Sequence, residues 1–310
     1  MLRVVVLGSA AGGGIPQWNC GCDVCNAARK TPGGFQMTQA SLAISADDRH
    51  WFLLNASPDI RQQIIAIPRL HPQAGVLRHS PIAGVILTNA EVDAVAGLLS
   101  LREGSPFAIY AHPRVLATLH ANSIFNVLDR NRVPRRAITL EAAFEPALPD
   151  GAASGITVLP FAVPGKVAWY LESGADANFP ADDPGDTLGL QITDRRTGRS
   201  FFYLPACARM TPELRSRIEG AAMIFFDGTL WRDDELIAAG LGHKTGQRMG
   251  HMAMSGPDGA IAALADAAIG RKIFLHINNS NPVVLPDSDE RRIAEKEGWE
   301  IPADGTEYLL

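Results

Sequence analysis

The sequence predicts an α/β protein whose functional side chains follow the carboxyl ends of buried strands. Residues 2–7 form an apolar run rich in β-branched side chains, which is typical of a buried strand, and a glycine-rich turn follows at residues 8–14. Residues 85–99 (VILTNAEVDAVAGLL) predict, in order, the end of a buried strand, a short polar turn and an apolar helix. In open α/β sheets, functional groups gather where strand ends meet such turns.

Composition argues against two broad classes of function. The chain has 310 residues, a formal net charge of −5, 46% hydrophobic residues and 20% charged residues. The negative charge argues against a broad nucleic-acid footprint, and the chain has no apolar run of about eighteen residues that would span a membrane. The apolar start turns to glycine after seven residues, which is too short for a signal peptide. We therefore expect a cytoplasmic protein with a single domain over residues 1–310.

The remaining elements follow from the same patterns in chain order. Residues 41–45 and 51–55 predict a hairpin that turns at Asp47 and Asp48, and Ser57 or Asp59 could cap a helix over residues 60–67. The acidic, proline- and glycine-rich residues 176–186 predict an exposed loop or lid. Further strands are expected at 82–87, 107–111, 156–162, 188–193, 200–204, 222–226 and 273–276, and further helices over 95–101, over 113–125 and from 257 onward.

The glycine-rich turn does not match the dinucleotide fingerprint, because Ile15-Pro16-Gln17-Trp18 follows it where a helix should start. We interpret its glycines as backbone that approaches an adjacent site closely.

Three of the four cysteines lie within six residues of one another, in a loop over residues 18–26. Cys20, Cys22 and Cys25 have a compact spacing, and three thiolates of one loop can wrap a zinc ion while a distant residue supplies the fourth ligand. In a cytosolic α/β protein such a cluster predicts a metal site more readily than a disulfide.

The polar turn carries two carboxylates, Glu91 and Asp93, two residues apart. In an extended turn both side chains point the same way, and they repel each other unless a cation or a proton holds them. His276 ends an apolar strand before an asparagine-rich turn, a position that is more often functional than part of a core.

Other reactive side chains have plainer interpretations. We interpret His112 and His120 as ordinary surface or helix-face histidines, and Cys207 as a buried thiol in preference to a soft-metal ligand. Asp227 follows a strand, so it lies at the rim of the same cleft or caps the next turn. A solvated loop that could also meet an acidic substrate is expected at Arg130, Arg132, Arg135 and Arg136.

Seven motifs between residues 4 and 282 together resemble the metallo-β-lactamase superfamily, and within it the branch that serves pyrroloquinoline quinone (PQQ) biosynthesis. They are VLGSAAGGGIPQWNCGCDVC, LLNASPDIR, GLLSLREG, DTLGL, DGTLW, MGHMAMSGP and LHINNSNP. The resemblance implies an αββα sandwich.

The resemblance also exposes departures from a zinc hydrolase. The superfamily's first metal motif is Thr-His-x-His-x-Asp-His, and here Thr88 and Asp93 keep their places. Asn89, Glu91 and Ala94 stand where its histidines would be. A further ligand histidine is missing at residues 163–166, and Ala206-Cys207 replaces the bridging aspartate.

The resemblance carries over further roles by position. His276 matches the superfamily's last ligand histidine, and His251 matches a histidine that transfers protons in RNase Z-like members. In phosphonate-pathway phosphodiesterases a histidine completes the cysteine zinc site, and its place is taken here by Asn279. His251 is the alternative fourth zinc ligand unless it serves the active site.

The implied activity follows from the ligands that remain. Glu91, Asp93 and His276 would hold an active-site iron(II), with manganese, magnesium or zinc as substitutes, and His251 and Asp93 would be catalytic. The resemblance implies an oxygenase that hydroxylates the tyrosine ring of a glutamate–tyrosine PQQ precursor. The alternative is a non-catalytic carrier of PQQ or its precursor, with a role in transport to the periplasm. Other proteins of the PQQ pathway and a second copy of this chain are candidate partners.

Overall fold

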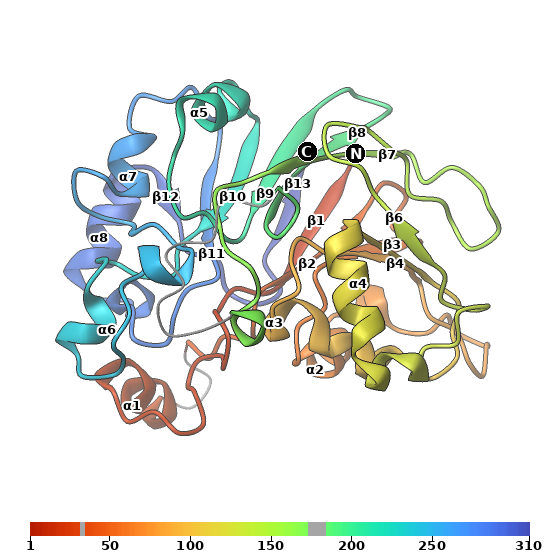
Figure 1. Cartoon of the computed structure of the whole chain (residues 1–310), viewed down its shortest axis with the longest axis horizontal. Helices are drawn as coiled ribbons and strands as arrows, with labels where there is room; N and C mark the ends of the chain where they lie inside the picture. Colours follow the sequence, from red (N-terminus) through yellow and green to blue (C-terminus); the bar gives the residue numbers. More distant parts are fainter. Residues whose placement is uncertain (32–34, 173–183) are drawn as a thin grey trace.

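Two mixed β-sheets form the centre of the molecule (Figure 1). The computed structural model describes residues 1–31, 35–172 and 184–310, so the predicted acidic loop at 176–186 lies outside the described residues except for its last three. The seven-stranded sheet has the order β13 (Glu307–Leu309), β1 (Arg3–Gly8), β2 (Ser41–Ser45), β3 (Trp51–Leu54), β4 (Ile82–Ile86), β5 (Ala108–Ala111), β6 (Arg135–Ala137). The six-stranded sheet has the order β12 (Trp299–Glu300), β11 (Lys272–Leu275), β10 (Met223–Asp227), β9 (Ser200–Leu204), β8 (Leu188–Asp194), β7 (Ile156–Ala162).

Each sheet has an antiparallel half and a parallel half. In the first sheet, β13, β1, β2 and β3 pair antiparallel and β3 to β6 pair parallel. In the second, β7 to β9 pair antiparallel and β9 to β12 pair parallel. The predicted hairpin at 41–55 is confirmed, and the strands predicted at 188–193 and 200–204 also pair antiparallel.

Helices cover the outer faces of both sheets, which gives the expected αββα layers (Figure 1). One apolar cluster lies between the sheets, and one lies between each sheet and its helices. The first sheet packs against α2 (Ile60–Ala66), α3 (Val92–Val95), α4 (Pro113–Ala121) and the 3-10 turns η2 (Ala96–Leu101) and η3 (Ser123–Val127). The second packs against α1 (Asp23–Lys30), α5 (Pro212–Ile218), α7 (Ala260–Ala263), α8 (Asp289–Lys296) and η6 (Pro282–Val284). The remaining short elements are α6 (Glu235–Ala238), η1 (Pro68–Leu70), η4 (Trp169–Leu171) and η5 (Gln247–Met249).

The helix predicted over residues 95–101 is a 3-10 turn, η2, that follows a single α-helical turn, α3. Gly97 explains the close packing of this segment. Its backbone N–H donates to the Ala56 carbonyl at 2.9 Å, and a Cβ at Gly97 would meet the Ser57 carbonyl oxygen at 2.1 Å. The small residues of this stretch therefore bring η2 directly onto the turn after β3.

Two predicted details at helix ends are wrong. Neither Ser57 nor Asp59 caps α2 with its side chain, because the Asp59 carboxylate instead accepts hydrogen bonds from the backbone and side-chain N–H groups of Gln39. The helix predicted to run to residue 125 ends at Ala121, and η3 follows it. Among the described residues, no helix is both long and apolar enough to cross a bilayer.

Candidate metal centre and pocket

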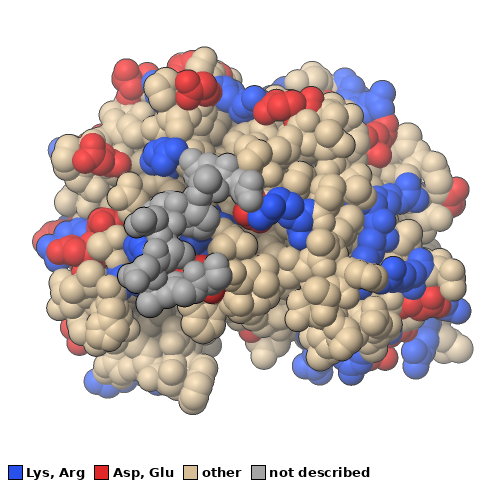
Figure 2. Space-filling view, in the orientation of Figure 1, with Lys and Arg blue, Asp and Glu red and all other residues tan. Residues whose placement is uncertain are grey.

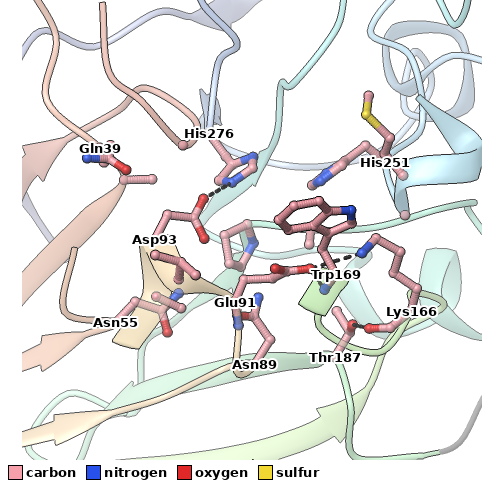
Figure 3. A pocket seen from close by; sticks show the side chains of 18 of the residues that line it. Gln39, Asn55, Asn89, Glu91, Asp93, Lys166, Trp169, Thr187, His251 and His276 are labelled. Atoms are coloured by element: carbon pink, nitrogen blue, oxygen red, sulfur yellow. Dashed lines mark hydrogen bonds and ion pairs between the residues drawn. The ribbon is translucent and has the colours of Figure 1, made fainter. Parts of the chain in front are cut away.

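A pocket of about 500 Å³ opens where the strand ends of both sheets meet (Figure 3). The first sheet contributes the glycine turn after β1 and the polar turn after β4, and the second contributes the residue that follows β11. Side chains of four predicted site residues line it: Glu91, Asp93, His251 and His276. The pocket also includes Lys166 and Trp169, for which the sequence analysis had no role.

Asp93 and His276 face each other on the floor of the pocket (Figure 3). Asp93 Oδ2 lies 2.9 Å from His276 Nε2, and the two side chains are only 18% and 15% exposed. Burial alone would lower the pKa of His276, but the hydrogen bond and charge of Asp93 outweigh it and raise that pKa. Burial likewise raises the pKa of Asp93, and the hydrogen bond to His276 reverses the shift so that the pKa is lowered.

Hydrogen bonds hold the segments that carry Asp93 and His276 in place. On the first sheet, the Asn55 side chain accepts from the Thr88 N–H at 2.9 Å and donates to Thr88 Oγ1 at 2.9 Å, which ties the polar turn to the end of β3. On the second, His276 has a left-handed backbone with φ of 58°, and the following N–H of Ile277 donates to the Ser9 carbonyl. A non-glycine residue in this region is uncommon and often marks a functional position.

The Thr229 hydroxyl connects the pocket histidines to a buried carboxylate. It lies 2.7 Å from Asp227 Oδ1, 2.8 Å from His276 Nδ1 and 3.0 Å from His251 Nδ1. An ionised carboxylate only accepts, so the single hydroxyl proton goes to Asp227 and Thr229 accepts from His276 Nδ1–H. The Nε2 atom of His276 then faces Asp93, and a metal ion held between the two side chains would take the place of the Nε2 proton.

His251 is oriented by Asp227, which is fully buried. Asp227 Oδ2 lies 2.7 Å from His251 Nδ1 and accepts from the Cys207 N–H at 2.8 Å. The rings of His251 and His276 stack with centroids 4.9 Å apart. Because the Nδ1 atom of His251 is directed at Asp227, its Nε2 atom faces the pocket. His251 groups with Asp227 and His276 and does not belong to the cysteine cluster.

Glu91 points to the side wall of the same pocket (Figure 3). Its Oε1 accepts from Lys166 Nζ at 3.0 Å and from the Trp169 N–H at 2.9 Å. Lys166 is only 11% exposed and also pairs with Glu172 at 2.9 Å. Both described bonds of Glu91 use Oε1, so its Oε2 is left for another partner.

The donor set of the pocket fits a single metal ion. When two ligand atoms each lie about 2.1 Å from a metal ion and the ligand–metal–ligand angle is about 90°, the two atoms are about 3 Å apart. Asp93 Oδ2 and His276 Nε2 have this spacing, at 2.9 Å. Within the described ranges, two groups of three metal-capable side chains have ligand atoms within 4.8 Å of one another. One is the cysteine cluster and the other is Asp227, His251 and His276, so neither group includes Glu91 or Asp93.

The cysteine cluster forms the second centre, and the predicted loop over residues 18–26 is wrong in one respect, because α1 begins at Asp23 and Cys25 lies in its first turn. Cys20, Cys22 and Cys25 converge, and the Asn279 carbonyl oxygen lies 3.4 Å from Cys22 Sγ while its Nδ2 lies 3.3 Å from Cys25 Sγ. Burial raises the pKa of Cys22 to about 11. Burial also acts to raise the pKa of Cys20, but hydrogen bonds from Cys22 outweigh it, so the pKa of Cys20 is lowered. Three soft sulfurs and a nearby carbonyl fit tetrahedral zinc, and Asn279 is the one of the two candidate fourth ligands that lies at this site.

The other singled-out residues have structural partners. Cys207 is fully buried and donates to the Arg209 carbonyl, and burial raises its pKa. His112 Nδ1 accepts from the Arg114 N–H at the start of α4, and His120 pairs with Arg130. Basic side chains gather on the side of the molecule where β6 lies (Figure 2), and the Arg132 and Arg135 guanidinium groups donate to the carbonyls of Gly104 and Phe125.

Sequence reasoning missed Lys166 and Trp169, which line the pocket, and Thr229, a buried residue whose hydroxyl contacts the two pocket histidines. The motif DGTLW pointed to Asp227 alone, although a hydroxyl two residues after a strand-end carboxylate is a signal for such a network. No comparable signal marks Lys166, which lies 75 residues from its partner Glu91.

Comparisons with known proteins agree with this architecture. A family model described as "Beta-lactamase superfamily domain" matches residues 50–277. The coenzyme PQQ synthesis protein B of Bradyrhizobium diazoefficiens is 65% identical over 310 residues, which is all of both chains. The crystal structure of Zn²⁺-bound PqqB from Methylobacterium extorquens superposes with a TM-score of 0.93 at 49% identity, covering 99% of this chain and 100% of that one. A diphosphatase of the PhnP family, 17% identical with a TM-score of 0.67 over 99% of this chain and 96% of its own, shares the fold.

Proposed function

This chain belongs to the PqqB family of the metallo-β-lactamase superfamily, and on that premise we propose that it is an iron(II)-dependent oxygenase of PQQ biosynthesis. It would hydroxylate the tyrosine ring of a glutamate–tyrosine precursor. The observation that carries the proposal is the pair Asp93 and His276, which face each other 2.9 Å apart on the floor of an open pocket. Most histidines of a two-zinc hydrolase are absent around it, because Asn89, Glu91 and Ala94 replace them.

Asp93 and His276 would hold the iron, with Glu91 Oε2 as the third donor. An oxygen-rich donor set with one imidazole suits iron(II) or manganese better than a pair of zinc ions. When bound, iron supplies the activation of dioxygen. In the overall balance, one oxygen atom enters the ring and the other leaves as water, with two electrons from an external reductant.

The chain's own residues would supply the proton transfer and the orientation. His251 donates Nδ1–H to buried Asp227, so its Nε2 can accept the phenol proton of a tyrosine ring held in the pocket. The adjacent carboxylate stabilises the resulting imidazolium, as the orienting acid of a catalytic triad does. Lys166 would keep the Glu91 carboxylate at the wall of the pocket through its contact with Oε1.

The test is anaerobic reconstitution of the full-length protein with iron(II), followed by addition of a glutamate–tyrosine substrate, a reductant and ¹⁸O₂. We expect a mass gain of one or two labelled oxygen atoms and a matching change in the ultraviolet spectrum. The gain should be lost in Asp93→Ala and His276→Ala, and each variant should still bind one zinc at the cysteine cluster, which serves as the control for folding.

An unchanged substrate mass with the iron-loaded wild-type protein would contradict the oxygenase. Saturable binding of the precursor or of PQQ without turnover, unaffected by Asp93→Ala, would then support the carrier function, including a role in transport to the periplasm. The structural zinc at the cysteine cluster, with Asn279 as its fourth ligand, is proposed for either function.

A further inference from the structure

Trp169 is an exposed aromatic side chain at the mouth of the pocket. Its ring lies across the pocket opening, close to the labelled side chains of Glu91, Lys166 and His251 (Figure 3). The side chain is 67% exposed. A large aromatic surface left in water beside a reactive pocket is unfavourable for the free protein, and covering it with a ligand would release that cost.

The exposure of the ring is not the result of a loose backbone. The Trp169 N–H donates to Glu91 Oε1 at 2.9 Å, and the Tyr170 hydroxyl donates to the Ala90 carbonyl at 2.7 Å. The preceding residue, Ala168, is buried in the core beneath the helices of the first sheet. The short turn η4 is therefore tied to the polar turn that carries Asp93, and it presents the ring in a defined place.

The rest of the pocket has a matching division between apolar and polar surface. Val92 is 54% exposed and lines the pocket with Trp169, and Met249 adds further apolar surface. The floor is polar, with Asp93 and His276. This arrangement suits a flat apolar group that contacts Trp169 with one face and turns its edge toward the floor.

Charge does not explain recognition at this side of the pocket. Lys166 Nζ already contacts the carboxylates of Glu91 and Glu172 and the carbonyl of Val167, at 3.0, 2.9 and 3.2 Å. A substrate carboxylate would have to displace one of these partners. The Trp169 side chain, by contrast, is largely exposed.

We propose that Trp169 is a specificity-determining residue that stacks on the aromatic ring of the substrate and selects planar rings over aliphatic groups of equal size. The inference deepens the proposed function, on which it rests for the identity of the substrate, because it names the part of the precursor that the pocket holds. Stacked aromatic pairs gain binding energy beyond that of the buried area, whereas an aliphatic ring gains the area alone.

The test measures binding without turnover. The full-length protein is loaded with zinc, which has no redox chemistry, and titrated with L-phenylalanine and with β-cyclohexyl-L-alanine, which has the same carbon skeleton without the aromatic system. We expect wild-type protein to bind the aromatic probe about five- to tenfold more tightly. Trp169→Leu should abolish this preference, and Trp169→Phe should retain most of it.

Leu171→Ala provides the matched control. Leu171 belongs to the same turn and is 44% exposed, but it does not line the pocket, so its truncation should leave the preference for the aromatic probe unchanged. An equal preference in wild type and Trp169→Leu would overturn the inference, and so would the absence of saturable binding of phenylalanine by the wild-type protein.

The two proposals fail in different ways. A protein that prefers the aromatic probe through Trp169 but never inserts oxygen leaves this inference intact and contradicts the oxygenase. A protein that oxygenates the precursor but shows no dependence of ring preference on Trp169 contradicts this inference alone.

Discussion

Thr229 is the single side chain on which the geometry of the pocket floor depends most directly. Thr229 is only 4% exposed. Its hydroxyl oxygen lies 2.7 Å from Asp227 Oδ1, 2.8 Å from His276 Nδ1 and 3.0 Å from His251 Nδ1. By donating to the carboxylate and accepting from His276, it directs Nε2 of that histidine toward Asp93. Groups that orient a metal ligand in this way commonly change metal affinity 10- to 100-fold when removed, as an order of magnitude.

We therefore expect Thr229→Val, which keeps the shape and removes the hydroxyl, to weaken iron(II) or zinc binding at the Asp93–His276 site about tenfold or more. Thr229→Ser should restore most of the affinity. Metal titration of each variant measures the effect, and the cysteine cluster of the same chain reports whether the fold is intact. Equal affinities of the valine variant and the wild type would show that Thr229 has no orienting role.

Glu91 shows what a residue type can predict and what it cannot. Its place in the polar turn predicted a carboxylate at the pocket, and the structure puts it there. Its partner Lys166 comes from a loop after β7, so the ion pair depends on how the two sheets pack. Local sequence carries no information about a contact between segments so far apart.

The turn at residues 276–279, which carries His276, contacts the glycine-rich segment after β1 and the cysteine cluster. On one side, the Ala11 N–H donates to the Ile277 carbonyl at 2.7 Å, which attaches the turn to the glycine-rich segment after β1. On the other side, Asn279 contacts the sulfurs of Cys22 and Cys25. A zinc ion at the cysteine loop would therefore also hold the turn that positions His276.

Removal of that zinc should affect both centres. We expect Cys25→Ser to lose one equivalent of bound zinc and to weaken metal binding at the Asp93–His276 site several-fold, because the 276–279 turn loses its attachment to the cysteine cluster. Elemental analysis and metal titration measure the two effects. Cys207→Ala is the control, since Cys207 does not belong to the cluster and its replacement should leave the zinc content unchanged. Unaltered zinc content in Cys25→Ser would contradict the assignment of the cysteine site.

Both chain ends lie together at the seam between the sheets, where N and C are marked in Figure 1. The Leu310 N–H donates to the Leu2 carbonyl, and the Leu2 N–H donates to Asp194 of the second sheet. The returning segment also brings Asp304 against Thr38, which donates to Asp304 Oδ2 from its N–H and its hydroxyl. The other oxygen, Oδ1, is buried and has no hydrogen-bond partner among the described residues.

This carboxyl gives the stability of the whole molecule a pH dependence of known sign. Burial raises the pKa of Asp304 to about 6, above its ordinary value of 3.8. Between these two pH values the folded state holds more protons than the unfolded state, so the free energy of unfolding falls as pH rises. The contribution is present below about pH 4 and is lost by about pH 6–7, with a size on the order of 1–3 kcal/mol.

We expect Asp304→Asn to remove this pH dependence. Between pH 4 and pH 8 the free energy of unfolding should therefore fall less in the variant than in the wild type. Urea unfolding at several pH values gives the difference. Asp258→Asn, at an exposed carboxylate, controls for the change in net charge. Parallel pH profiles of wild type and Asp304→Asn would contradict the prediction.

Residue types and their spacing were enough to predict the α/β class, most strand positions, the cysteine cluster and two side chains that line the pocket, Asp93 and His276. Each of these depends on a local pattern: alternation in a strand, a compact ligand motif, or a polar residue directly after an apolar run. Helix ends were less predictable from the sequence. Asp59 accepts a hydrogen bond from Gln39 and does not cap its own helix, and Gly97 packs against the backbone of the turn after β3.

The contacts that make the site work were decided by the packing of the two sheets. Asp93 and His276 are 183 residues apart, and Lys166 reaches Glu91 from the other sheet. Thr229 meets His276 because β10 and β11 are parallel neighbours whose carboxyl ends lie side by side, and His251 reaches the same hydroxyl from the loop after η5. The physical reason is that hydrogen-bond geometry depends on distances of a few tenths of an ångström, which are set by the packing of the whole core and not by any one segment.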